Sequence, residues 1–414
     1  MNDLFLVSLF SIAGSGVGIL TGLIPGLHTN NIALLMLFFA SLAQEKWSIY
    51  FCIFLVSASI THTFLDIIPS TFIGAAEEDT ALVVLPAHSM LLEGKGYDAI
   101  AISALSSLAS VITCFLLLLP FKFILAEPAN LYLLLEKILP WILICISLLV
   151  IFTNENFLYA LLIFFLSGIF GMVILNMNTS FMVKSSSIFP ALAGLFGVPA
   201  IIRAYKTVVP EQIIGEKVIE ENRKRMKKRD VISGTIAGGI VSVLPGVSSA
   251  IATTIALITR KERNRENTIS ILSATNTATN FFVLATLFIL LKARSGFAIA
   301  ISKLVSVEKW DKIIFPYPFN LFLIATIISS LLSYYATLKI GRVVAKNISN
   351  ISYSSLLKIS LAIIILMVFI FNGILGMLIL FVASSIGLLC LEFKVRRSVC
   401  MGILLLPLIL RYFL

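Results

Sequence analysis

Charged side chains are scarce in this sequence, and their scarcity excludes an ordinary soluble domain. Charged residues make up 13% of the 414 positions, whereas hydrophobic residues make up 59%. A soluble domain carries about 25% charged residues. The apolar residues instead form repeated stretches of about 20 residues, the length that a helix needs to cross a bilayer. The sequence therefore predicts an all-α, multi-pass protein of the cytoplasmic membrane.

Motifs of catalysis and of metal binding are also missing. The five cysteines form no CxxC pair and stand in or beside apolar segments, so we interpret them as packing residues. His28, His62 and His88 show no HxH or HxxxH spacing, which disfavours zinc. No GxSxG or HExxH motif is present, so we predict no enzyme. The net charge of +10 lies mostly in short loops, which indicates membrane topology and no nucleic-acid partner.

Two halves of the chain share a pattern. The arrangement G-x3-G-x6-P-G spans residues 14–26 and recurs at 234–246, an offset of 245 − 25 = 220. Further on, "SITHTFLD" (59–66) aligns with "SATNTATN" (273–280) at an offset of 214. Because these matches occur in the same order, we predict two structural repeats. They cover residues 1–205 and 231–414, joined by a basic cytoplasmic linker at 206–230.

The second proline–glycine pair indicates a re-entrant hairpin. The apolar run 231–258 has strongly basic stretches on both sides, at 223–230 and 260–266, so both flanks should be cytoplasmic. Pro245 and Gly246 divide this run into pieces of about 14 and 12 residues, each too short to cross a bilayer. A hairpin with its tip at mid-membrane satisfies both facts. The alternative is one continuous helix with a proline kink.

Counting crossings predicts that the two halves are inverted relative to each other. We expect a matching first hairpin over about 4–43, entering from outside, and about five crossings in each half. In the first half these lie near 49–68, 98–120, 138–153, 157–178 and 186–204. In the second, two lie near 269–291 and 313–338, and further crossings follow. Inverted repeats with broken helices at the midplane are a recurring plan of secondary transporters.

Three blocks of the sequence resemble a known family. They are "PGL" (25–27), "IPSTFIGAAEEDTALVVLPAHSMLLEGKGYDAIAIS" (68–103) and "GTIAGGIVSVLPGVSSAIATTIALITRKER" (234–263). These blocks are similar to the TctA-type large membrane subunit of tripartite tricarboxylate transporters, although His28 and Ser70 stand where that family usually has glycine. The resemblance implies ion-driven uptake of small carboxylates. It also implies two partners, a small membrane subunit and an extracytoplasmic binding protein.

Small polar residues follow both proline–glycine pairs. A helix that starts after such a break points its unpaired N–H groups and positive dipole end at the tip, so two converging tips would bind an anion. The alternative is that these small residues only allow close helix packing. The predicted substrate-binding residues are Gly26, His28, Thr29, Asn30, Asn31, Gly246, Ser248, Ser249 and Thr253.

A second polar cluster predicts a site for the coupling ion. We expect the two aligned segments to be locally unwound, so that hydroxyls and carbonyls coordinate Na⁺ or a carboxylate carries H⁺. Asp66 is the only acid of its segment; alternatively, it lies at the wet cytoplasmic end of its helix. The predicted ion-coupling residues are Thr61, His62, Thr63, Asp66, Thr275, Asn276, Thr277 and Asn280. Apart from this ion we expect no metal and no cofactor.

Three functions fit these patterns. The first is an ion-coupled secondary transporter that moves a small organic anion by alternating access. The second is a translocase of a lipid-linked anion such as polyprenyl phosphate. The remote third is an intramembrane enzyme that uses Asp66 and His62 as acid and base. Membrane lipid is an expected partner throughout, and a homodimer is compatible with the sequence.

Overall fold

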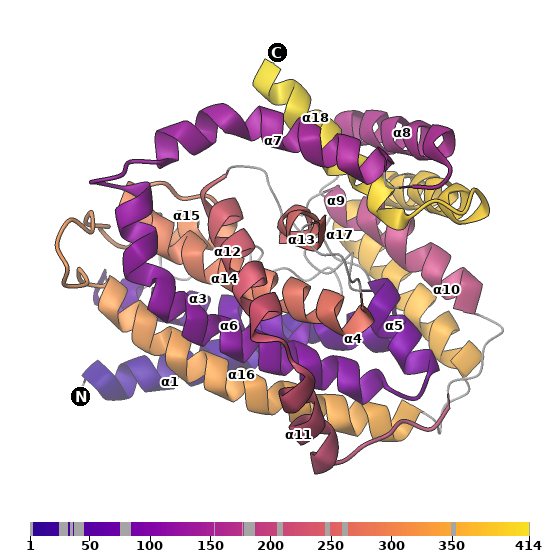
Figure 1. The fold of residues 1–414 in the computed structure, drawn as a ribbon. Coiled ribbons are helices and arrows are strands. Elements are labelled where there is room, and N and C mark those ends of the chain that lie inside the picture. The colour runs from indigo at the N-terminus through magenta and orange to yellow at the C-terminus, as the bar shows by residue number, and fades with distance from the viewer. Residues whose placement is uncertain are drawn as a thin grey trace.

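The structure is a computed structural model. It describes residues 3–24, 32–33, 36, 45–74, 84–152, 154–175, 177, 187–204, 210–244, 249–258, 264–348 and 353–413. Every regular element in these ranges is a helix, and eight of the helices are long and apolar enough to cross a membrane (Figure 1). The prediction of an all-helical, multi-pass membrane protein is therefore confirmed.

Helices α1 to α10 lie in the first half of the chain. Their bounds are α1 (Asp3–Leu23), η1 (Glu45–Trp47), α3 (Ser48–Leu65), α4 (Ile67–Phe72), α5 (Val84–Leu92), α6 (Gly96–Leu125), α7 (Tyr132–Phe152), α8 (Phe157–Leu175), α9 (Ile188–Leu192), the π-helical turn η2 (Ala193–Gly197) and α10 (Val198–Ala204).

Helices α11 to α18 follow. Their bounds are α11 (Glu216–Arg225), α12 (Lys228–Val243), α13 (Ser249–Ile258), α14 (Arg265–Leu290), α15 (Gly296–Leu304), α16 (Phe319–Ile348), α17 (Tyr353–Glu392), η3 (Arg397–Met401) and α18 (Gly402–Phe413).

In the first half, α1 packs directly against α3, and the two helices run in the same direction. A Cβ atom added to Gly14 would meet the carbonyl oxygen of Phe54, and one added to Gly18 would meet that of Ala58. Residue numbers rise together along the contact, so the helices are parallel. The chain that links them must therefore return to the end of the molecule where α1 begins.

The second half repeats this arrangement with α12 and α14. A Cβ atom added to Gly234 would meet the carbonyl oxygen of Ile271, and one added to Gly238 would meet that of Thr275. These two helices are also parallel. Lys227 and Glu266, at their starting ends, line one small pocket, so both helices begin on the same side of the molecule.

The break between α12 and α13 lies outside the described residues, at 245–248. The two helices have 16 and 10 residues, and neither is among the eight candidate spans. Figure 1 shows α13 end-on and α12 along its length. The predicted first hairpin differs from the second, because its first helix, α1, has 21 residues and is itself long enough to cross a membrane. Both re-entrant hairpins remain predictions.

The two parallel pairs meet where α3 crosses α14. Ser59 contacts Asn280 and Asp66 contacts Asn276, so residue numbers fall in α14 as they rise in α3, and these helices are antiparallel. Two 30-residue helices cover the crossing: α6 packs on α12 and α14, and α16 packs on α1 and α3. The long helix α6 of the first half thus packs on the helix pair of the second half, and α16 of the second half packs on the helix pair of the first.

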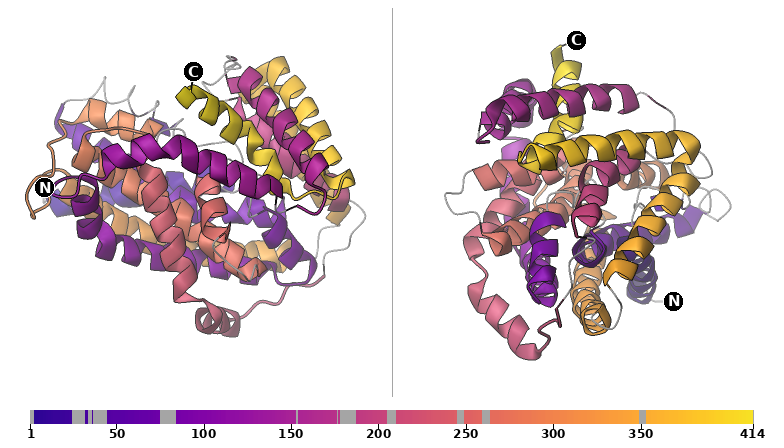
Figure 2. Two further views of the ribbon diagram at one scale, coloured as in Figure 1. Left: turned by 45° about the horizontal axis from the view of Figure 1, so that its top comes forward. Right: turned by 90° about the vertical axis from the view of Figure 1, so that its right-hand side faces the viewer.

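A second layer of helices lies along the top and right of Figure 1 and is seen from two other directions in Figure 2. It consists of α7, α8, the run from α9 to α10, α17 and α18, and all of these except α10 contribute buried residues to one hydrophobic core. Glycines again allow close approach, since a Cβ atom at Gly171 of α8 would meet the carbonyl oxygen of Ile403 in α18.

Two predicted crossings differ from the observed helices, and a third helix is sharply kinked. The crossing near 186–204 is a run of α9, η2 and α10, because Pro199 has no N–H to bond the carbonyl of Leu195. The crossing predicted at 313–338 begins later, at Phe319 after Pro316 and Pro318, and continues to Ile348. Helix α17 turns sharply part-way (Figure 2), with non-helical angles at Gly373 (φ 62°, ψ −153°) that favour glycine.

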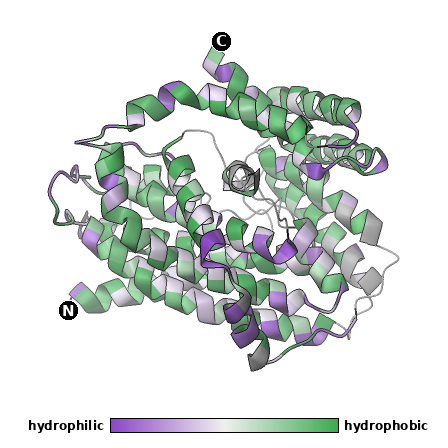
Figure 3. Ribbon diagram, in the orientation of Figure 1, coloured by the Kyte–Doolittle hydropathy of each residue, from purple (hydrophilic) through white to green (hydrophobic). Residues whose placement is uncertain are grey.

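The described part of the linker makes hydrogen bonds to helices of the first half. The Gln212 side chain donates to the carbonyl oxygen of Leu91 (3.1 Å) and accepts from the backbone N–H of Gly96 (2.8 Å). Asn222 in α11 donates to Asp98 at the start of α6 (2.9 Å). Hydrophilic residues gather at α11 and at the neighbouring helix starts (Figure 3), which agrees with a cytoplasmic end there.

Candidate functional site

The crossing of α3 and α14 holds a ladder of polar contacts. The Ser59 hydroxyl donates to Asn280 Oδ1 (2.8 Å), and the hydroxyls of Thr63 and Thr277 share a hydrogen bond (3.2 Å). At the third rung, the amide of Asn276 donates to Asp66 Oδ2 (2.7 Å). The structure thus brings together the two segments that the sequence alignment paired.

The prediction that these segments are unwound is wrong. Residues 59–65 lie within the regular helix α3, and residues 273–280 lie within α14. Their hydroxyls bond to their own helix, as Thr63 does to the carbonyl of Ile60 (2.8 Å) and Thr275 to that of Ile271 (2.7 Å). The polar side chains avoid lipid because neighbouring helices cover them, so an intact backbone can carry them.

Asp66 stands at a helix boundary inside the protein. Its backbone N–H completes α3 by bonding to the carbonyl of His62 (3.1 Å), and α4 begins at the next residue. The Ser70 hydroxyl donates to the Asp66 carbonyl (2.8 Å). Since Asp66 is only 4% exposed, the alternative of a wet carboxylate at the helix end is not what the structure shows.

Asn276 offers an oxygen next to this carboxylate. Its amide nitrogen faces Asp66, and within the described part of the chain its buried Oδ1 has no hydrogen-bond partner. A buried carbonyl oxygen left without a partner costs about 1–3 kcal/mol. Such an oxygen beside a carboxylate is a candidate ligand for a hard cation.

Helices α1 and α16 complete one side of the polar layer. The His62 ring nitrogen Nδ1 lies 3.2 Å from the Thr21 hydroxyl of α1, and the Ser333 hydroxyl of α16 donates to Thr61 Oγ1 (2.8 Å). The Thr337 hydroxyl bonds to the carbonyl of Phe64 (3.2 Å). Thr21, Ser333 and Thr337 were missed by the sequence analysis. The four-residue spacing from Ser333 to Thr337 was the signal that could have found the α16 face.

Helix α6 completes the other side with a stripe of serines that the sequence analysis also missed. Ser103 accepts from the hydroxyl of Ser273 (2.8 Å), and Ser106 donates to Ser270 (2.8 Å). Ser110 donates to the carbonyl of Ala274 (2.9 Å). Positions 103, 106, 107 and 110 share one helix face, so this stripe could also have been found from spacing.

Most of the predicted anion site lies outside the described residues. This holds for Gly26, His28, Thr29, Asn30, Asn31, Gly246 and Ser248. Ser249 is described and is the first residue of α13; Thr253 follows one turn later and donates to the Ser249 carbonyl (2.9 Å). Both side chains are buried.

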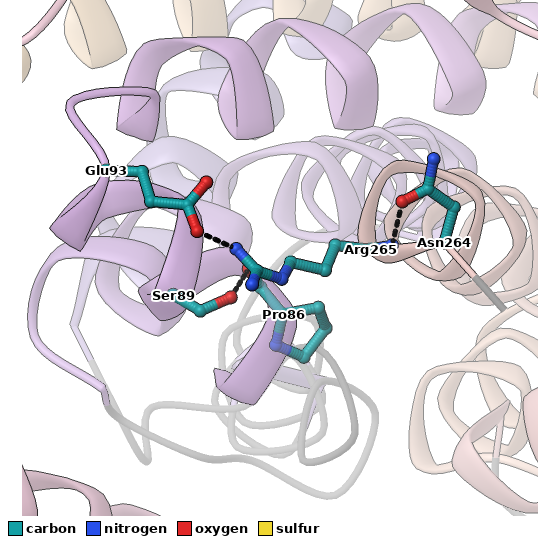
Figure 4. A network of polar contacts seen from close by, with 5 residues as sticks. All are labelled: Pro86, Ser89, Glu93, Asn264 and Arg265. Atoms are coloured by element: carbon teal, nitrogen blue, oxygen red, sulfur yellow. Dashed lines mark hydrogen bonds and ion pairs between the residues drawn. The ribbon is translucent and has the colours of Figure 1, made fainter.

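A contact between the two halves lies at the linker end of the molecule (Figure 4). The Arg265 guanidinium at the start of α14 forms an ion pair with Glu93, just after α5. The hydrogen bond from Arg265 lowers the pKa of Glu93 below its ordinary value. Asn264 caps α14 by accepting the backbone N–H of Arg265 (3.0 Å), and Ser89 donates to the carbonyl of Pro86 (2.8 Å). The paired side chains are 48% and 49% exposed, so solvent screens this ion pair.

Comparison with known proteins identifies the family. Residues 9–402 match the Tripartite tricarboxylate transporter TctA family. The chain belongs to the TctA family. It is also 31% identical, over 410 residues, to an uncharacterized protein of Methanocaldococcus jannaschii, a match that covers 98% of each chain. No solved structure matches it.

TctA membership confirms the resemblance found in the sequence blocks. It assigns the chain to the transport permeases and not to the enzymes, and the family name denotes a tripartite system for tricarboxylates. The buried polar layer around Asp66 is therefore a layer inside a membrane permease.

Proposed function

We propose that this TctA-family protein is an ion-coupled secondary transporter that carries a small carboxylate across the cytoplasmic membrane by alternating access. The observation that carries the proposal is the buried contact between Asp66 and Asn276, at the crossing of helices from the two halves. An ionisable residue inside a membrane protein is a functional candidate by default, because burying its charge is costly.

The helix directions favour inverted repeats, which alternating access would use. Within each half a parallel pair is joined through glycines, and the two pairs are antiparallel to each other. The glycine contacts relate Phe54 to Ile271 (271 − 54 = 217) and Ala58 to Thr275 (275 − 58 = 217). This offset of 217 residues is three residues larger than the offset of 214 between the aligned segments 59–66 and 273–280. Three residues are close to one helical turn, so both offsets align the same helix face.

Asp66 and Asn276 supply the coupling chemistry in this proposal. A carboxylate and a buried amide oxygen suit Na⁺, which prefers hard oxygen ligands. The hydroxyls of Thr61, Thr63 and Thr277 lie in the same layer and can add neutral ligands. The same carboxylate can instead carry a proton. In either case, binding of the cation neutralises the charge on Asp66 and changes the energy of moving α3 against α14.

The anion is proposed to bind at the two proline–glycine breaks. Helix α13 begins at Ser249, directly after the second break, so its first N–H groups have no partner within the helix. The tripartite family name favours two accessory partners, a small membrane subunit and an extracytoplasmic binding protein.

Transport in proteoliposomes tests this function. The purified chain, with and without its proposed partners, would be given labelled citrate or succinate under an inward Na⁺ gradient, a proton gradient or neither. We expect accumulation above equilibrium with one of the two gradients. Transport of neither carboxylate, together with saturable binding of polyprenyl phosphate, would reject the proposal and favour the lipid-anion alternative.

A further inference from the structure

Two cationic side chains are buried among the residues that the structure describes, Lys122 and Arg397, at 3% and 4% exposure. Lys122 has a structural explanation. Its ammonium donates to the carbonyl oxygens of Asp311 (2.9 Å) and Lys312 (2.6 Å) and lies 4.8 Å from the centre of the Trp310 ring. These contacts hold the loop before α16 against the end of α6.

Arg397 lies at a different place, where the two halves of the chain meet. It is the first residue of η3, in the second half, and its Nη1 donates to the carbonyl of Phe196 in the π-helical turn η2 (2.8 Å). A guanidinium stays charged at every physiological pH. A permanently charged group buried in a membrane protein is costly, and such groups commonly mark a substrate path.

The turn that receives Arg397 packs closely against α17. Gly194 of η2 and Gly387 of α17 allow close approach, since a Cβ atom on either would meet a carbonyl oxygen of the other element. π-Helical turns are rare and often occur at functional sites. The Phe196 carbonyl therefore fixes one side of the guanidinium in place.

His88 and Thr71 belong to α5 and α4, whose buried residues Ala87 and Phe72 lie in one hydrophobic cluster with Ala193 of η2, the turn that binds Arg397. The His88 ring nitrogen Nδ1 lies 3.1 Å from the carbonyl oxygen of Thr71, so it carries the hydrogen and donates. Burial lowers the pKa of His88, and the nearby charge of Arg397 lowers it further. Helix α5, which carries His88, is not one of the eight spans.

The Thr71 hydroxyl is fully buried, and within the described ranges it has no hydrogen-bond partner. A buried hydroxyl without a partner destabilises the protein by about the free energy of a lost hydrogen bond. Its presence points to a polar ligand that is bound during the working cycle.

We propose that Arg397 contacts a carboxylate group of the transported anion, and that the Thr71 hydroxyl donates a hydrogen bond to the same anion. This inference rests on the proposed carboxylate transport. The forked guanidinium matches the two oxygens of a carboxylate, which a lysine ammonium cannot do. Thr71 belongs to the six-residue helix α4 that begins directly after Asp66, so the anion contact and the ion site share one short element.

Citrate binding to the purified full chain tests the assignment, with affinity and melting temperature measured together. We expect Arg397→Gln to weaken citrate binding by about 100-fold, as loss of one partner of a buried charged pair does. Arg397→Lys keeps the charge and loses the fork, and should weaken binding about 10-fold. Lys122→Gln is the matched control, a buried cation that should lower the melting temperature and leave the citrate affinity unchanged.

Thr71→Val separates a binding role from a structural one. Removing a hydroxyl that has no hydrogen-bond partner among the described residues should raise the melting temperature of the ligand-free protein and weaken citrate binding several-fold. Wild-type citrate affinity in Arg397→Gln and Arg397→Lys would overturn the inference and leave Arg397 as a cap for Phe196. Wild-type affinity in Thr71→Val would overturn the role of Thr71. If the wild type bound neither citrate nor succinate, the carboxylate function would fail together with this assignment.

Discussion

Asn276 in α14 donates a hydrogen bond of 2.7 Å to the carboxylate of Asp66, 210 residues away at the end of α3. The two residues come from different halves of the chain and meet inside the protein. Any relative movement of α3 and α14 must break or remake this contact. The pair is therefore placed where ion binding and helix movement can affect each other.

Replacing the carboxylate should separate coupling from transport. We expect Asp66→Asn to lose accumulation driven by an ion gradient, because an amide neither binds a proton nor balances a cation's charge, while exchange of labelled citrate across the membrane continues. Uptake against a gradient and exchange at equilibrium would be measured in proteoliposomes. Asp311→Asn, an exposed acid in the loop before α16, is the control and should leave both rates unchanged. Full gradient-driven uptake in Asp66→Asn would exclude Asp66 as the coupling acid.

Two glycines of α1, two residues apart, should respond oppositely to alanine. A Cβ atom at Gly14 would overlap the carbonyl of Phe54, whereas one at Gly16 would meet nothing within 4 Å. Gly14→Ala should destabilise the protein by about 1–3 kcal/mol through overpacking. Gly16→Ala should be neutral or stabilise it by up to about 1 kcal/mol. Thermal unfolding in lipid nanodiscs measures both, and equal melting temperatures would contradict the close α1–α3 contact.

Cysteine labelling can show on which side of the membrane helices α12 and α14 begin. In a cysteine-free background, Lys228→Cys and Asn264→Cys should both react with a membrane-impermeant thiol reagent from the cytoplasmic side, because α12 and α14 start at the same end. Ile314→Cys, in the exposed loop before α16, should react from the opposite side. Labelling of positions 228 and 264 from opposite faces would rule out a re-entrant arrangement between them.

The Glu93–Arg265 ion pair should make a pH-dependent contribution to stability. Because the pKa of Glu93 is lowered in the folded state, the pair stabilises the protein above the ordinary carboxyl value near 4.5. That stabilisation is lost as the pH falls through the lowered value. Wild type should thus melt slightly above Glu93→Gln at pH 7, and the difference should shrink as the pH falls below 4.5 and also shrink in high salt. A difference that persists at low pH would show that Glu93 acts through packing instead.

Much of the fold could be predicted from the sequence. Hydrophobic runs near 49–68, 98–120 and 269–291 are helices in the structure, because the bilayer requires an apolar stretch of fixed length. The re-entrant hairpin that the basic flanks of 231–258 indicate remains a prediction. Element boundaries near prolines were less predictable, as the late start of α16 shows.

The candidate site could be predicted only in part. The two aligned polar segments predicted Thr63, Asp66, Asn276 and Thr277 as site residues. In the structure Thr63 contacts Thr277, and Asp66 contacts Asn276. The unwinding predicted for them failed, because the sequence does not show which helices will cover a polar face. The serines of α6 and the hydroxyls of α16 were missed for the same reason.

The sequence by itself determined that this chain is a helical membrane permease of the TctA family, because the lengths of the apolar stretches and the order of the family motifs are properties of the sequence. The tertiary structure alone decided which polar groups meet, that Asp66 is buried, and that Arg397 reaches a π-helical turn. The physical reason is that a buried polar group must find a partner. That partner is set by the direction and crossing of helices more than 200 residues apart, which no local pattern records.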